Sequence, residues 1–155
     1  MDTFIHVLVW GGWLSLGSLI VAAVSWMIDP KIWGADLNLA KKYQNRTGGI
    51  ITLVVFFGVQ FPIMAYTAAT YQQIDAELNF WWAFVIIYLT FQVFNLADLI
   101  IFDWLIYLKL KPAFMYPDYF PQTGTFKKHF IDFIKGFYIG IIPCLIGTGL
   151  WKLFF

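Results

Sequence analysis

The sequence predicts an all-α integral membrane protein, a four-helix bundle with short cytoplasmic loops. Of its 155 residues, 61% are hydrophobic and 12% are charged, whereas soluble domains carry about 25% charged residues. So small a domain leaves too much surface exposed to hide this excess in a core. Long apolar stretches and an uneven distribution of Lys and Arg complete the pattern. We expect one transmembrane domain over residues 1–155.

The apolar stretches are each long enough to cross a bilayer, since a helix needs about 20 residues to do so. We predict spans at about 4–28, 49–70, 80–110 and 131–155. Pro62 and Pro143 each remove a backbone N–H from a span, so kinks are expected near both.

The cations predict the orientation of the spans. Two alternate loops and their flanks hold nearly all of them: Lys31, Lys41, Lys42 and Arg46, then Lys109, Lys111, Lys127, Lys128 and Lys135. The loop between the second and third spans has Asp75 and Glu77 and no cation. Because cytoplasmic loops carry the excess of Lys and Arg, the basic loops are expected inside and both termini outside.

Small residues recur at helical spacing on three spans, and helices in lipid pack closely through such residues. The stripes are Gly11, Ser15, Ser18, Ala22 and Ser25; Gly58, Pro62, Ala65 and Ala69; and Gly136, Gly140, Cys144 and Gly147. They fit a bundle within one chain, a homo-oligomer or contact with partner subunits, and the sequence leaves these open.

The third span instead carries polar residues, which fall within an arc of about 140° on a helical wheel. They are Tyr88, Gln92, Asn95, Asp98 and Asp103. An acid near the middle of a bilayer costs about 2.5–3.5 kcal/mol, so Asp98 is a candidate functional residue. Tyr88, Gln92 and Asn95 complete this polar intramembrane site, and the alternative for Asn95 is an interhelical hydrogen bond to Ser15 or Ser18. No metal assignment follows.

Asp103 has a simpler interpretation. It lies about 12 Å from the middle of the span, towards the basic boundary. We expect a structural ion pair with Arg46, Lys135 or Lys109 there, because charges within membranes commonly pair. His129 follows two lysines and is expected to be a solvated loop residue.

The segment "FNLAD", residues 94–98, resembles the FNxAD box of lipoprotein signal peptidases. That resemblance implies an aspartic dyad in which Asp98 is one catalytic acid. A dyad needs a second carboxylate close enough to share a proton, and the other spans have no acid at mid-depth. Asp103 would lie about 140° around an α-helix and about 7.5 Å along it from Asp98. The protease interpretation is therefore rejected, and no catalytic residue is assigned.

A broader resemblance rests on "NLADLIIFDW", "KPAFMYP" and "FIKGFYIG". These segments are similar to an uncharacterised group of small bacterial multispan proteins with an NLxDLxxxDW-like segment. The resemblance implies a multi-pass protein of the bacterial inner membrane and a shared role for Asn95, Asp98, Asp103 and Trp104. It implies no activity.

Three classes of function remain. The favoured one is a polar site that binds or conducts a proton, a cation or a small polar solute. The others are an accessory or structural membrane subunit and a membrane enzyme acting on a lipid or isoprenoid at the cytoplasmic face. No nucleotide-binding glycine motif is present, so no cofactor is expected. A net charge of +1 gives no basic field for nucleic acid, which leaves membrane lipids as the expected partners.

Overall fold

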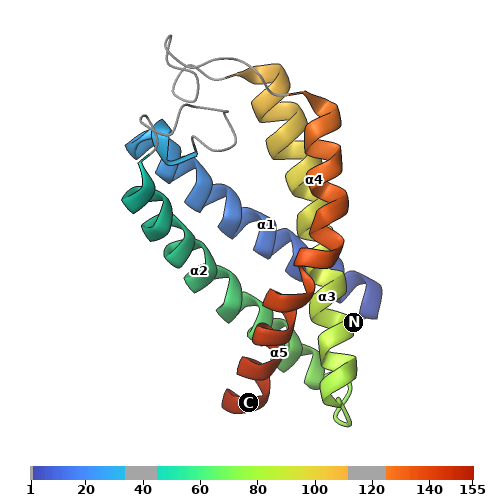
Figure 1. The fold of residues 1–155 in the computed structure, drawn as a ribbon. Helices are drawn as coiled ribbons and strands as arrows, with labels where there is room; N and C mark the ends of the chain where they lie inside the picture. Colours follow the sequence, from blue (N-terminus) through green and yellow to red (C-terminus); the bar gives the residue numbers. More distant parts are fainter. Residues whose placement is uncertain (1, 34–44, 112–124) are drawn as a thin grey trace.

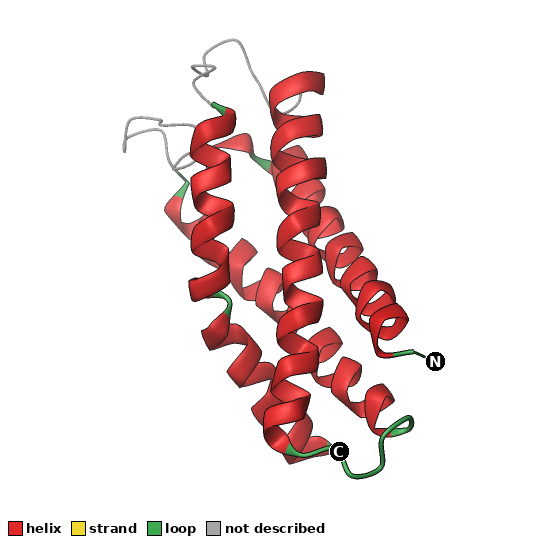
Figure 2. Cartoon of the chain, turned by 90° about the vertical axis from the view of Figure 1, so that its right-hand side faces the viewer, coloured by secondary structure: helices red, strands yellow, loops and turns green. Residues whose placement is uncertain are grey.

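The computed structural model describes residues 2–33, 45–111 and 125–155, and these parts are helical without any strand (Figures 1 and 2). The elements are α1 (Thr3–Ile28), a 3₁₀ turn η1 (Pro30–Trp33), α2 (Arg46–Gln72), α3 (Phe80–Ala97), a π-helix η3 (Asp98–Leu110), α4 (Phe126–Ile139) and α5 (Ile141–Phe154). The all-α prediction is confirmed for the described residues. Lys41 and Lys42 lie outside them.

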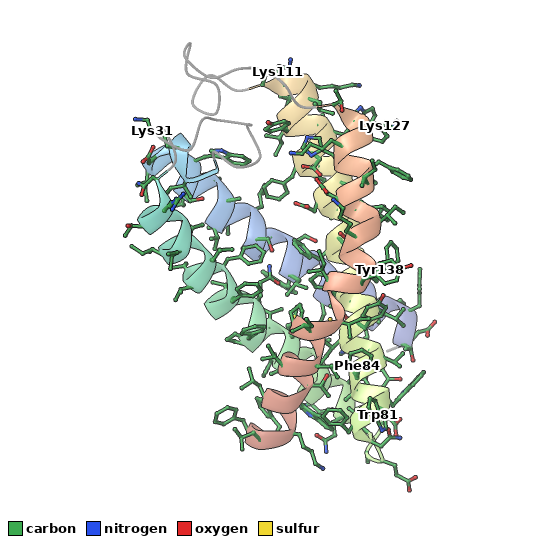
Figure 3. All side chains as sticks on the ribbon, in the orientation of Figure 1. Lys31, Trp81, Phe84, Lys111, Lys127 and Tyr138 are labelled. Atoms are coloured by element: carbon green, nitrogen blue, oxygen red, sulfur yellow. The ribbon has the colours of Figure 1, made fainter. Side chains whose placement is uncertain are left out.

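The long helices alternate in direction. In Figure 1, α1 rises towards the upper end, α2 descends, α3 and η3 rise, and α4 and α5 descend. Figure 3 places Lys31, Lys111 and Lys127 together at the upper end and Trp81 at the other. The predicted basic flanks therefore share one end of the fold, and both chain termini lie away from it. We refer to this as the basic end.

Side chains just outside the helices fix where they begin. At the basic end, Asn45 Oδ1 accepts a hydrogen bond of 2.8 Å from Gly48 N and caps α2. Its amide also donates to Asp29 Oδ2 at 2.8 Å, across the turn that follows α1. Asn79 caps α3 in the same way, through the backbone N–H of Trp82. The end of α1 is thus tied to the start of α2.

The stretch predicted as the fourth span is broken into α4 and α5. The two helices bend by 40° at Gly140. Pro143, in the first turn of α5, lacks the N–H that would bond Ile139 O, so one backbone hydrogen bond is missing at the bend. Within residues 2–33, 45–111 and 125–155, three helices are long and apolar enough to cross a membrane: α1, α2 and the continuous α3–η3 rod. The bent pair is a fourth if it is counted as one span. By contrast, α2 runs through Pro62 as a single helix.

Small residues mark the closest helix contacts, as predicted for α4 and α5. A Cβ on Gly140 would lie 2.3 Å from Phe91 Cε1, and one on Gly147 would lie 2.8 Å from Met64 Cβ. The stripe predicted on the second span is wrong at Gly58, where a Cβ would meet nothing within 4 Å. Ala65 of that stripe is buried, and the buried face of α2 also includes Gln60, Met64 and Ala68.

The crossing of α1 and α3 depends on Gly11, so Gly11→Ala is expected to destabilise the fold. Its Cβ would lie 2.5 Å from Val93 Cβ and 3.2 Å from Thr90 O, and these atoms move only with the helix. Overpacking of this kind costs about 1–3 kcal/mol. The matched control is Gly12→Ala, where a Cβ meets nothing within 4 Å. Unfolding of both variants in mixed micelles measures the difference; equal stability would contradict the assigned contact.

Candidate functional site

The segment that holds Asp98 and Asp103 is a π-helix, Asp98–Leu110. Its backbone bonds join residues five apart, so Asp98 and Asp103 lie one above the other on successive turns. The angular separation predicted from the sequence is wrong, because it assumed the α-helical period. Lys111 ends the segment with a left-handed φ of 42°, and its N–H bonds Ile106 O at 2.9 Å.

Asp98 and Asp103 both line a pocket of about 220 Å³, which we call the acidic pocket. α1 and α2 form its other walls, including Ser18, Trp26, Thr52 and Phe56. In Figure 1 the upper parts of α1 and α2 lean away from η3 and α4. The residues of α1 that line the acidic pocket, Ser18, Ala22 and Trp26, belong to the half of α1 nearer the basic end.

Asp103 contacts α4 through the side chain of His129. His129 Nδ1 lies 2.8 Å from Asp103 Oδ1 and donates to it, and the His129 side chain is 8% exposed. The ring of Tyr107 packs edge-on against the imidazole, with centroids 5.0 Å apart. The expectation that His129 is solvated is wrong. The buried Nε2 of His129 has no hydrogen-bond partner among the described residues.

This contact replaces the ion pair expected between Asp103 and Arg46 or Lys135. Lys135 bonds Asp132 on the exposed side of α4 at 2.8 Å. Because α4 runs antiparallel to η3, its first turns are level with Asp103, and Lys135 lies six residues, about 9 Å, further along the helix. The register of α4 against η3 therefore brings His129, and not Lys135, next to Asp103.

Tyr88, Gln92 and Asn95 face α4 instead of the acidic pocket. Asn95 Nδ2 donates to Phe133 O at 3.1 Å and to Gln92 Oε1 at 3.2 Å. Tyr88 Oη donates to Phe137 O at 2.9 Å, in the last turn before the bend. The interhelical bond considered for Asn95 is present, but its acceptor is on α4 and not on Ser15 or Ser18. The polar set predicted as one site is thus divided between two surfaces of the third rod.

Gln60 is a polar residue that the sequence reasoning missed. It is 2% exposed, and its amide donates to Ser18 Oγ, which donates in turn to Leu14 O at 2.7 Å. Gln60 Oε1 is buried without a hydrogen-bond partner in the described part of the chain. A single glutamine inside an apolar span was the available signal. Its bond to Ser18 joins α1 to α2 beside the acidic pocket.

Comparison with protein-family models, curated proteins and solved structures gives no match to this chain. The resemblance to a group of small bacterial multispan proteins therefore stays a prediction. The fold and the site define a class: a helical protein with three to four candidate membrane spans and an acidic pocket between three of its helical rods.

Proposed function

We propose that the chain is a four-span protein of the bacterial inner membrane that binds a small cation in the acidic pocket, as a small transporter or channel does. The observation that carries the proposal is the meeting of Asp98 and Asp103 at one pocket walled by three helical rods. Carboxylates that share a site favour a proton or a cation between them, because each raises the cost of ionising the other.

The chemistry of the walls favours an organic cation of the ammonium type. A volume of about 220 Å³ corresponds to about seven water molecules at about 30 Å³ each, more than a bare metal ion fills. Aromatic residues, Trp26, Phe56 and Phe102 among them, line the same space as the acids. Aromatic faces attract quaternary ammonium groups. Among the described residues, no group of three or more His, Cys, Asp or Glu side chains gathers at ligand distance.

The basic end is taken to face the cytoplasm, since cytoplasmic loops carry the excess of Lys and Arg. Both termini then lie outside. The acidic pocket lies between mid-membrane and the cytoplasmic boundary, with Asp98 as its deeper acid and Asp103 nearer the boundary.

The test is binding of tetramethylammonium to the purified protein in nanodiscs, measured by isothermal titration calorimetry. Asp98→Asn and Asp103→Asn are each expected to weaken binding about tenfold or more, because opposite unit charges about 5 Å apart attract by about 3 kcal/mol at an effective dielectric constant of about 20. Asp132→Asn is the matched control, since Asp132 is exposed on α4 and bonds Lys135. If the pocket variants bind as tightly as Asp132→Asn, the proposal is wrong.

A further inference from the structure

A second pocket lies beside the acidic pocket and shares three lining residues with it, Phe94, Asp98 and Phe102. It has a volume of about 300 Å³ and lies between α1 and the α3–η3 rod. α2 contributes no residue to it, whereas α2 walls the acidic pocket. We call it the lateral groove. Asp98 is therefore reached from two sides of the α1–α3 crossing.

The lateral groove is apolar and open at the surface. Leu8, Leu16 and Ile101 line it and are 43%, 44% and 41% exposed. In a bilayer such side chains contact acyl chains, since the surrounding medium is hydrocarbon. Asp98 is the one acid among the residues that line it, and it lies where the groove meets the acidic pocket.

We propose that the lateral groove admits a single-chain amphipathic cation from the bilayer, an alkylamine or alkyl quaternary ammonium. The cationic head reaches Asp98 while the alkyl tail lies along the groove. This inference rests on the proposed cation site and names its substrate class. Two features favour this occupant: the carboxylate at the inner end complements the head, and the apolar open remainder suits the tail.

The groove also provides a path by which an ammonium head can reach Asp98. An ammonium head that reached Asp98 through the hydrocarbon without a protein wall would lose its hydration with nothing to replace it. Along the groove the head passes Ser15, whose hydroxyl donates its proton to Gly11 O at 2.7 Å and turns its oxygen lone pairs to other groups. The tail stays in apolar surroundings throughout, so little free energy changes for it between bilayer and groove.

Gly12 offers a way to close the groove without disturbing the fold. It lines the groove, and a Cβ there would meet nothing within 4 Å. Gly12→Leu therefore places four carbons in the space assigned to the tail. Gly58→Leu is the matched control. A Cβ on Gly58 also meets nothing within 4 Å, and Gly58 lines neither the groove nor the acidic pocket.

The experiment compares decyltrimethylammonium with tetramethylammonium, which share a head group and differ in the tail. Binding is measured by calorimetry to the full chain in nanodiscs, with empty nanodiscs subtracted to remove partition into lipid. Gly12→Leu is expected to bind decyltrimethylammonium about tenfold more weakly than Gly58→Leu does. This is the low end of the effect of a change in size within an apolar pocket. Asp98→Asn is expected to weaken the binding of both probes.

The outcomes separate this inference from the proposed function. Gly12→Leu and Gly58→Leu could bind decyltrimethylammonium equally while Asp98→Asn weakens the binding of tetramethylammonium. That result overturns the proposed role of the groove and leaves the proposed cation site standing. If Asp98→Asn changes the affinity for neither probe, both proposals are overturned. Selective loss of the alkyl probe in Gly12→Leu supports the groove, because a misfolded variant would lose both probes.

Discussion

Gly136→Ala is expected to loosen α4 from α3 and to lower the free energy of unfolding by about 1–3 kcal/mol, as overpacking does. A Cβ on Gly136 would lie 2.4 Å from Asn95 Oδ1 and 2.7 Å from Asn95 Nδ2. Asn95 cannot retreat without losing its bond to Phe133 O. The intrinsic helix preference of alanine over glycine, about 1 kcal/mol, opposes the effect only in part. Unfolding of the purified protein by SDS in mixed micelles measures the change.

A double-mutant cycle tests the cause. Asn95→Ala alone removes the interhelical bond, and Asn95→Ala with Gly136→Ala also removes the clash. The double variant is expected to be more stable than the sum of the single effects by about 0.5–3 kcal/mol. Gly149→Ala is the control, because a Cβ there meets nothing within 4 Å. Strict additivity of Asn95→Ala and Gly136→Ala would contradict the assigned contact.

His129→Phe is the second substitution with a large expected effect. It keeps an aromatic ring against Tyr107 but removes the N–H that donates to Asp103 Oδ1 at 2.8 Å. A hydrogen bond to a charged group contributes about 1.5–3 kcal/mol, and we expect a loss of this size. The Asp103 side chain, 23% exposed, then lacks this donor. The measurement is again the midpoint of SDS unfolding.

His129→Asn separates the donor from the ring. The asparagine amide offers an N–H close to the position of Nδ1, so the bond to Asp103 is kept while the packing on Tyr107 is lost. It is expected to be more stable than His129→Phe. The reverse order would mean that His129 contributes mainly by ring packing and that its bond to Asp103 adds little.

The sequence was sufficient for features that depend on local composition. The apolar stretches match the described helices closely, because length and hydrophobicity are local properties. The small residues Gly11, Gly140 and Gly147 lie at close contacts, as their spacing predicted. The break near Pro143 agrees with the kink predicted there, whereas α2 continues through Pro62 as one helix.

Other features depend on long-range geometry and could not be derived. No glycine or proline marks residues 98–110 as a π-helix, and only the five-residue spacing of Asp98 and Asp103 agrees with it. The partner of Asp103 depends on the register of α4 against η3, which no local pattern fixes. His129 lies beside two lysines in the sequence, yet it is buried by a helix that is distant along the chain. The separation of Tyr88, Gln92 and Asn95 from the two acids also depends on long-range geometry.

Gly11 and Gly12 are adjacent in α1, but the absence of a side chain has a different consequence at each position. At Gly11 it allows two backbones to approach, and at Gly12 it leaves room that no part of the described chain fills. A mutational screen scored by expression level alone would detect changes at the first position and overlook those at the second. Under the proposed groove, folding constrains Gly11 and the bound ligand constrains Gly12, and an assay of binding distinguishes the two.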